Sequence, residues 1–189
     1  MEDLSFSTLP SQRLTIRRFH PDDATALAAY RSDPDVAKYQ AWEVPYPLEK
    51  ARRFIESLEG AAPGAAGIWF QFAVALTSTG LLIGDCGLRP TPHGSSHAEL
   101  GFTFASDYQG KGYASEAVRR LLEYVFMSLA LERVFAITHV QNGAANRLLK
   151  RLGFEWKGHF TEDSSDKFDA ASEFMYEILR EDWELQHAS

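Results

Sequence analysis

The sequence predicts an α+β fold of three layers, in which helices cover both faces of a mixed, largely antiparallel central sheet of about seven strands. Two observations support this prediction. Three apolar segments between residues 68 and 105 follow one another without an intervening helix, as the strands of an antiparallel meander do. After residue 105, helical and strand patterns alternate, which adds helices to the faces of the same sheet.

The N-terminal third predicts one strand and two helices. A strand near 13–19 precedes a helix near 21–32, whose first turn is acidic, as helix N-termini favour. A loop rich in aromatic residues, from Tyr39 to Tyr46, leads to a second helix that begins near Pro47 and ends at Gly60. The Ala-Gly-Pro stretch at 60–67 is expected to be a flexible connection.

The rest of the chain predicts six strands and two helices. The segment 108–129 joins a glycine-containing turn to apolar residues spaced three and four apart, which is typical of an amphipathic helix. A further helix is expected at 143–152. Because there is no repeat and no linker long enough to separate domains, residues 1–189 are expected to form one domain. The expected strands lie near 68–77, 81–89, 97–105, 133–140, 154–161 and 172–180.

The most informative segment is a glycine-rich turn between a predicted strand and a predicted helix. It reads Gln109-Gly110-Lys111-Gly112-Tyr113-Ala114. Glycine lets the backbone bend sharply and leaves no Cβ in the way of a ligand. The first amides of the following helix lack partners within the helix, and the helix dipole is positive there. The turn is therefore a candidate site for a phosphate or diphosphate, although glycine pairs also make ordinary turns.

Two better-known phosphate motifs fit this turn poorly. The mononucleotide loop Gly-x-x-x-x-Gly-Lys-Ser/Thr does not occur in the sequence. The dinucleotide fingerprint Gly-x-Gly-x-x-Gly/Ala fails at Ser115. It also usually opens a βαβ unit, whereas this turn follows several strands in the middle of the chain. Nicotinamide binding is therefore the poorer interpretation.

The turn and two other segments resemble the GNAT superfamily of N-acetyltransferases. Residues 109–114 are similar to its Gln/Arg-x-x-Gly-x-Gly/Ala loop, which binds the diphosphate of acetyl-coenzyme A. Residues 142–154 resemble the family's following helix, which ends in Gly-Phe. Residues 13–19, with Asp23, are similar to the opening of the Rim-type branch, named for enzymes that acetylate the N-termini of ribosomal proteins. The resemblance covers about residues 12 to 183.

The resemblance implies acetyl-coenzyme A as the co-substrate and assigns residues to it. The backbone N–H around Phe104 is expected to stabilise the oxyanion that forms during acyl transfer. Asn142, at the start of the helix near 143, either caps that helix or bonds the pantetheine arm. The other expected cofactor-binding residues are Phe102 and Thr103 on the strand, and Gln109, Gly110, Lys111, Gly112, Tyr113 and Ala114 in the loop.

Glu99 is the candidate base. The attacking amine must be neutral, and at pH 7 roughly a tenth of an α-amino group is neutral but well under a thousandth of a lysine. A base therefore helps, and similar enzymes place a carboxylate facing the cleft on the strand that carries Glu99. Strand alternation places it on one face with Gly101 and Thr103. The alternative is a strand glutamate that only faces solvent.

Two departures from the family pattern leave the general acid unassigned. Leu149 stands where many relatives carry the tyrosine that protonates the departing thiolate, and Ala145 stands where Rim-type sequences commonly have serine. His139 is a possible replacement. A catalytically lapsed module that only binds coenzyme A therefore remains an alternative to an N-acetyltransferase, as does a nucleotide-binding scaffold with a coincidental loop.

Composition limits the remaining possibilities. The net charge of −7 argues against nucleic acid binding, and no apolar run approaches the roughly 18 residues that span a bilayer. The polar, acidic N-terminus gives no signal peptide, and the single Cys86, expected to be a core residue, suits a cytoplasmic protein. The six histidines show no metal-ligand spacing. The expected partner is an amine, either a protein N-terminus or a small molecule, and the chain is expected to be a monomer or homodimer. The acceptor wall that the resemblance implies includes Tyr39, Trp42, Glu43 and Tyr46, and its aromatic residues either pack against a substrate or only close the core.

Overall fold

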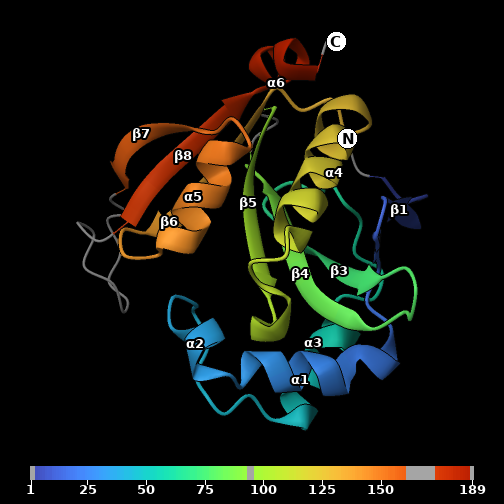
Figure 1. Cartoon of the computed structure of the whole chain (residues 1–189). Helices are drawn as coiled ribbons and strands as arrows, with labels where there is room; N and C mark the ends of the chain where they lie inside the picture. The colour runs from blue at the N-terminus through green and yellow to red at the C-terminus, as the bar shows by residue number, and fades with distance from the viewer. Residues whose placement is uncertain (1–2, 93–95, 161–172, 188–189) are drawn as a thin grey trace.

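The computed structural model describes residues 3–92, 96–160 and 173–187, and these form one twisted sheet with helices on both faces (Figure 1). The described part contains eight strands in the order β1-β2-β3-β4-β5-β6-β8-β7. All neighbours are antiparallel except β5 and β6, which are parallel. The predicted α+β fold with a mixed, largely antiparallel sheet is therefore confirmed, with one strand more than expected.

The elements follow the predicted order. The strands are β1 (Thr8–Pro10), β2 (Leu14–Arg17), β3 (Phe70–Leu76), β4 (Leu82–Pro90), β5 (His97–Phe104), β6 (Arg133–His139), β7 (Glu155–Phe160) and β8 (Glu173–Leu179). The α-helices are α1 (Ala24–Arg31), α2 (Pro34–Ala37), α3 (Leu48–Ser57), α4 (Tyr113–Met127), α5 (Gly143–Arg151) and α6 (Arg180–His187), with short 3₁₀ turns at Pro21–Asp23 and Ser106–Tyr108.

Three short elements were not predicted. β1 has three residues and α2 has four, so neither is long enough to show a periodic pattern. α6 follows β8 directly, where no breaker residue separates the strand from the helix. α2 matters for the site because it places one wall of the main cavity.

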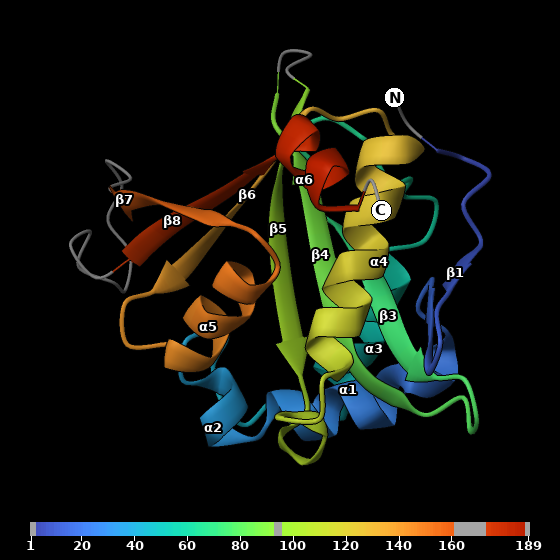
Figure 2. The same ribbon diagram turned by 45° about the horizontal axis from the view of Figure 1, so that its top comes forward.

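The two faces of the sheet carry two separate cores. On β3, Phe72 and Val74 belong to the core that also contains residues of α4, whereas Ala73 belongs to the core with residues of α1 and α3. Figures 1 and 2 show α4 and α5 on one side of the sheet and α1 and α3 on the other. This alternation is what a sheet buried between two helical layers requires.

Cys86 is fully buried, as expected for a core residue, and its burial raises the pKa of the thiol.

The parallel pair of strands opens part-way along its length. β5 and β6 are paired only through His97–Glu99 and Arg133–Phe135, although both strands continue for several residues. Beyond Glu99, β5 therefore has a strand partner on the β4 side but none on the β6 side.

Among the helices of the described residues, none combines the length and the hydrophobicity that a transmembrane segment requires.

Candidate active site

A cavity of about 390 Å³ lies where β5 and β6 diverge. Its walls come from α2, the end of β5, the glycine-rich loop, the start of α4 and one face of α5. The structure thus brings together segments that lie more than a hundred residues apart in the sequence. Of the residues predicted to bind the cofactor, Phe102, Thr103, Phe104, Gln109, Gly110, Gly112, Ala114 and Asn142 line this cavity.

The backbone of β5 presents polar groups to the opening. The N–H of Ala105 donates to the carbonyl of Ile83 on the β4 side at 3.0 Å. Because hydrogen-bonded pairs alternate along an antiparallel ladder, Thr103 bonds β4 in the same way. The N–H and C=O groups of Phe102 and Phe104 therefore point the other way, toward the gap beyond the β5–β6 pairing. An extended ligand in this gap can pair with β5 as an added strand would.

The glycine-rich loop has the backbone geometry that its composition predicts. Gly110 has φ of 70° and Gly112 has φ of 83°, both in the left-handed region that favours glycine. α4 begins at Tyr113 without a side-chain cap, so the amides of its first turn are available to a ligand. Gln109 Nε2 donates to the carbonyl of Phe104 at 2.8 Å and fixes the loop against β5. The loop therefore has the form of an anion site.

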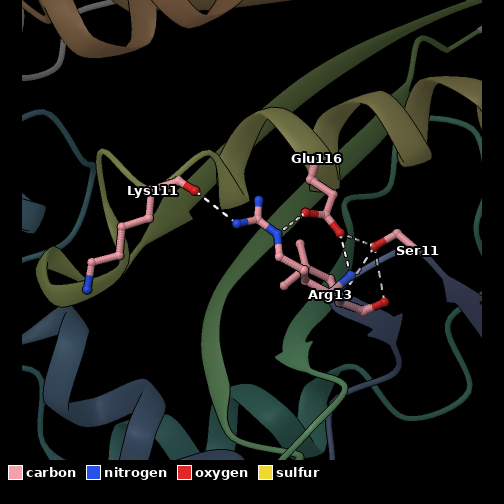
Figure 3. A network of polar contacts seen from close by, with 5 residues as sticks. Ser11, Arg13, Lys111 and Glu116 are labelled. Atoms are coloured by element: carbon pink, nitrogen blue, oxygen red, sulfur yellow. Dashed lines mark hydrogen bonds and ion pairs between the residues drawn. The ribbon is translucent and has the colours of Figure 1, made fainter.

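Two predicted loop residues do not line the cavity. The Nζ of Lys111 lies 5.7 Å from the ring of Tyr108, and the guanidinium carbon of Arg13 lies 4.3 Å from the centre of the Tyr113 ring. Glu116, one turn into α4, bonds Arg13 as well (Figure 3). Direct binding of a cofactor by the Lys111 and Tyr113 side chains stays a prediction.

α5 contributes an asparagine cap and two arginines. Asn142 Oδ1 accepts a hydrogen bond from the N–H of Ala145 at 3.2 Å, and the asparagine also lines the cavity. Arg147 and Arg151 lie four residues apart on α5 and both line the cavity. No ion pair with another described residue occupies either guanidinium. Their four-residue spacing in the sequence could have identified them, because it places both on one helix face.

The sequence model of a protein family, the acetyltransferase (GNAT) domain, matches residues 13–155 of this chain. The chain belongs to the GNAT family of acetyltransferases. The predicted resemblance to N-acetyltransferases of this family, including their Rim-type members, is confirmed, and dependence on acetyl-coenzyme A is general in the family.

Individual relatives agree with this assignment. An uncharacterized N-acetyltransferase, p20 of Bacillus licheniformis, is 32% identical over 93% of this chain and 98% of its own. A GNAT acetyltransferase structure from Bacillus anthracis is 30% identical, with a TM-score of 0.78 over 92% of this chain and 99% of that chain. The [ribosomal protein uS5]-alanine N-acetyltransferase of Escherichia coli is 29% identical over 80% of this chain and 79% of its own.

The two positions that depart from the GNAT pattern differ in their surroundings. Leu149 is fully buried in the main core and does not line the cavity, so a tyrosine there would have to displace core residues. Ala145 does line the cavity, where a serine hydroxyl would fit the family pattern. His139 does not line the cavity; its ring stacks on that of Tyr39, which does, with 5.0 Å between the ring centres. Its Nδ1 accepts from the N–H of Gln141 at 3.1 Å.

Of the expected acceptor wall, only Tyr39 lines the cavity. Trp42 and Tyr46 instead pack around the buried guanidinium of Arg31, with their ring centres 4.5 and 5.3 Å from its carbon. Trp42 also donates through Nε1 to the carbonyl of Arg31 at 3.0 Å. These two aromatic residues therefore close the core beneath α1, which was one of the two expected roles. Glu43 is exposed and does not line the cavity.

The structure does not bring Glu99 into the cavity. Its carboxylate forms an ion pair with Arg89, and its side chain is 14% exposed. Glu99 occupies the last paired position of β5 before the strands diverge, three residues from Phe102 in the cavity wall. The guanidinium of Arg89 lies 5.1 Å above the ring of Trp69. A catalytic role for Glu99 stays a prediction, and any proton transfer from the cavity would need a water between them.

Proposed function

We propose that this GNAT protein transfers the acetyl group of acetyl-coenzyme A directly to a primary amine, either a protein N-terminus or a small molecule. The observation that carries the proposal is the position of the cavity. It joins the glycine-rich loop, which has the geometry of an anion site, to the edge of β5 that has no strand partner, where the backbone of Phe102 and the N–H of Phe104 face the gap. A long ligand with a diphosphate at one end and amides along an extended arm matches both features.

The residues present suit acetyl-coenzyme A. The amides of Gly110, Gly112 and the first turn of α4 would receive the diphosphate, and Arg147 and Arg151 would add positive charge beside it. The thioester supplies the activated acetyl group. The N–H of Phe104, which faces the gap, would stabilise the developing oxyanion, while its carbonyl is already held by Gln109.

The reaction requires a neutral amine and a leaving thiolate. The amine nitrogen forms a bond to the thioester carbon, the carbon–sulfur bond breaks, and the proton lost by the amine passes to a base. We assign this proton to Glu99 through water, because Glu99 is the one carboxylate on β5 and occupies the last position paired with β6 before the strands diverge. A thiol with a pKa near 8.5 is a tolerable leaving group without an acid.

A second candidate is a lapsed module that binds coenzyme A without transferring its acetyl group. Leu149 favours it, because the aliphatic side chain that stands in place of the family's tyrosine has no proton to give to the thiolate. The two functions agree on the cofactor and differ only in turnover.

Two measurements test these functions. Isothermal titration with acetyl-coenzyme A should show binding at one site, and a protein that does not bind would contradict both candidates. A thiol-release screen over peptides with free N-terminal alanine or serine, polyamines, amino acids and antibiotics should find an acceptor for the transferase. Binding without release for every amine would favour the lapsed module.

A further inference from the structure

Arg13 connects the start of β2 to the glycine-rich loop. Its Nη1 donates to the carbonyl of Lys111 at 3.1 Å, and its Nε donates to Glu116 Oε2 at 2.7 Å (Figure 3). The guanidinium also lies over the ring of Tyr113. A single side chain thus contacts the loop and the first turns of α4, 98 and 103 residues along the chain.

Glu116 holds Arg13 in this position. Its Oε1 accepts from the backbone N–H of Arg13 at 2.7 Å and from Ser11 Oγ at 2.8 Å, and its Oε2 accepts from the guanidinium. The glutamate side chain is 15% exposed and that of Arg13 is 42% exposed. Because three hydrogen bonds hold the Glu116 carboxylate, its orientation is fixed. It therefore also fixes the orientation of the planar Arg13 guanidinium that it bonds.

Arg13 acts on the side of the loop that faces away from the cavity. Gly112 lines the cavity, whereas Arg13 does not. A Cβ placed on Gly112 would lie 3.4 Å from Arg13 Nη2, so the guanidinium lies beside the backbone of Gly112. The described chain has one cis peptide bond, between Val44 and Pro45, and the bond between Lys111 and Gly112 is trans. In a trans peptide the C=O and N–H groups point in opposite directions.

We propose that Arg13 is a positioning residue for the cofactor loop. By holding the Lys111 carbonyl on the outer side, it aims the N–H of Gly112 into the cavity, where the diphosphate of coenzyme A is expected. Glu116 and Ser11 fix Arg13 in turn. This inference rests on the proposed function, because it takes coenzyme A as the ligand. It makes the affinity of the loop for a diphosphate depend on a residue that does not touch it.

The chain offers a matched control. Arg120, further along α4, also ties the helix to the N-terminal segment, since its Nε donates to the carbonyl of Pro10 at 3.1 Å and its Nη1 lies 3.3 Å from Glu123 Oε2. It does not contact the loop. A role for Arg13 that is only structural would make Arg13→Ala and Arg120→Ala behave alike.

The test compares coenzyme A binding by the wild type, Arg13→Ala, Arg13→Lys and Arg120→Ala, after circular dichroism has shown that each is folded. We expect both Arg13 variants to weaken binding about tenfold, because lysine keeps the charge but cannot make the two directed bonds. Arg120→Ala should bind within about twofold of the wild type. If Arg13→Ala binds as tightly as the wild type, or if lysine restores affinity fully, the positioning role is wrong.

A second donor separates positioning from general damage to the site. S-acetylpantetheine carries the same thioester but no diphosphate. Arg13→Ala should raise KM for acetyl-coenzyme A while leaving kcat/KM for S-acetylpantetheine unchanged, and an equal loss with both donors would contradict the proposal. If the wild type itself binds no coenzyme A, the proposed function fails instead.

Discussion

Arg89 and Glu99 lie directly opposite each other on β4 and β5 and form an ion pair at the point where the sheet opens. Arg89 is also positioned by the ring of Trp69, which passes close to Gly87 and Gly101. The carboxylate that the sequence predicts as a base is therefore held in place by a cation before any substrate arrives. Its role as a base is tested by the dependence of kcat on pH.

Replacing Glu99 with Gln should lower kcat at neutral pH by about 100-fold, because general base catalysis typically contributes that much or more. The measurement is the dependence of kcat on pH for the wild type and the variant, with saturating acetyl-coenzyme A. The variant should lose the acid limb of the profile. An unchanged profile would remove Glu99 from the mechanism.

The control for this change is Glu177 on β8. It too is a strand glutamate in an ion pair with an arginine, Arg133, and its side chain is 12% exposed. Glu177 does not line the cavity, and it lies two strands from Glu99, on the far side of β6, where it pairs with Phe135. Glu177→Gln should therefore cost similar stability but leave kcat within about twofold of the wild type.

Replacing Gly112 with Val should abolish coenzyme A binding while leaving a folded protein. The backbone at Gly112 is left-handed, which a β-branched residue rarely adopts, and the new Cβ would lie 3.4 Å from Arg13 Nη2. Relief of either strain must move the loop. Isothermal titration with coenzyme A measures the loss, and affinity that survives the change would mean that the phosphate site lies elsewhere.

Gly80→Ala controls for the backbone strain in that experiment. Gly80 has φ of 73°, and nothing lies within 4 Å of a Cβ placed on it. It lies between β3 and β4, outside the main cavity. The alanine should cost about 1 kcal/mol of stability and leave coenzyme A affinity unchanged.

Asn142 can serve both of its expected roles at once. Its Oδ1 caps α5 by accepting from Ala145, which leaves the Nδ2 group of the same side chain for a ligand in the cavity. Asn142→Ser keeps a capping oxygen but loses the amide donor, so it should retain stability and raise KM for acetyl-coenzyme A about three- to tenfold. Asn142→Ala removes both the capping oxygen and the amide donor. It should therefore raise KM as well and lower the free energy of unfolding by about 1 kcal/mol. A serine variant with unchanged KM would leave the cap as the sole role.

The parts of this site that the sequence could predict are those set by local backbone chemistry. Gly110 and Gly112 stand where only glycine adopts the required φ without strain, and the strand and helix around them have clear apolar periods. These features need no knowledge of the rest of the fold. The order of the elements from 68 to 152 followed from the same patterns.

The contacts that the sequence could not predict depend on sheet register or on distant segments. Arg13 and Glu116 are 103 residues apart, and only the packing of β2 near α4 brings them together. The ion pair of Glu99 with Arg89 requires the β4–β5 register, which a one-residue slip would undo. Tyr39 was expected in the cavity wall from the family resemblance, but the helix α2 just before it, which helps to place it there, was not predicted.

The carboxylate of Glu116 gives a pH-dependent test of its bonds to Arg13. Burial opposes its ionisation, but the hydrogen bonds from the Arg13 backbone and guanidinium and from Ser11 outweigh this, so the pKa of Glu116 lies below its ordinary value. In the unfolded chain that value is about 4.3. Above it the carboxylate is ionised in both states, and its bonds contribute fully to stability. As the pH falls, the unfolded state takes up the proton first, and the contribution is lost on passing through the lower native pKa.

Glu116→Gln should therefore lower the free energy of unfolding by about 1–2 kcal/mol between pH 5.5 and 8, with little change across that range. The deficit should shrink once the pH drops below about 4.3, because the wild type then loses the same charge. Urea unfolding of both proteins at each pH measures the difference. Glu123→Gln, which removes the half-exposed partner of Arg120, should cost less than about 0.5 kcal/mol at every pH. A Glu116 deficit that grows as the solution becomes more acidic would contradict the assignment, because it would mean that burial rather than Arg13 governs this carboxylate.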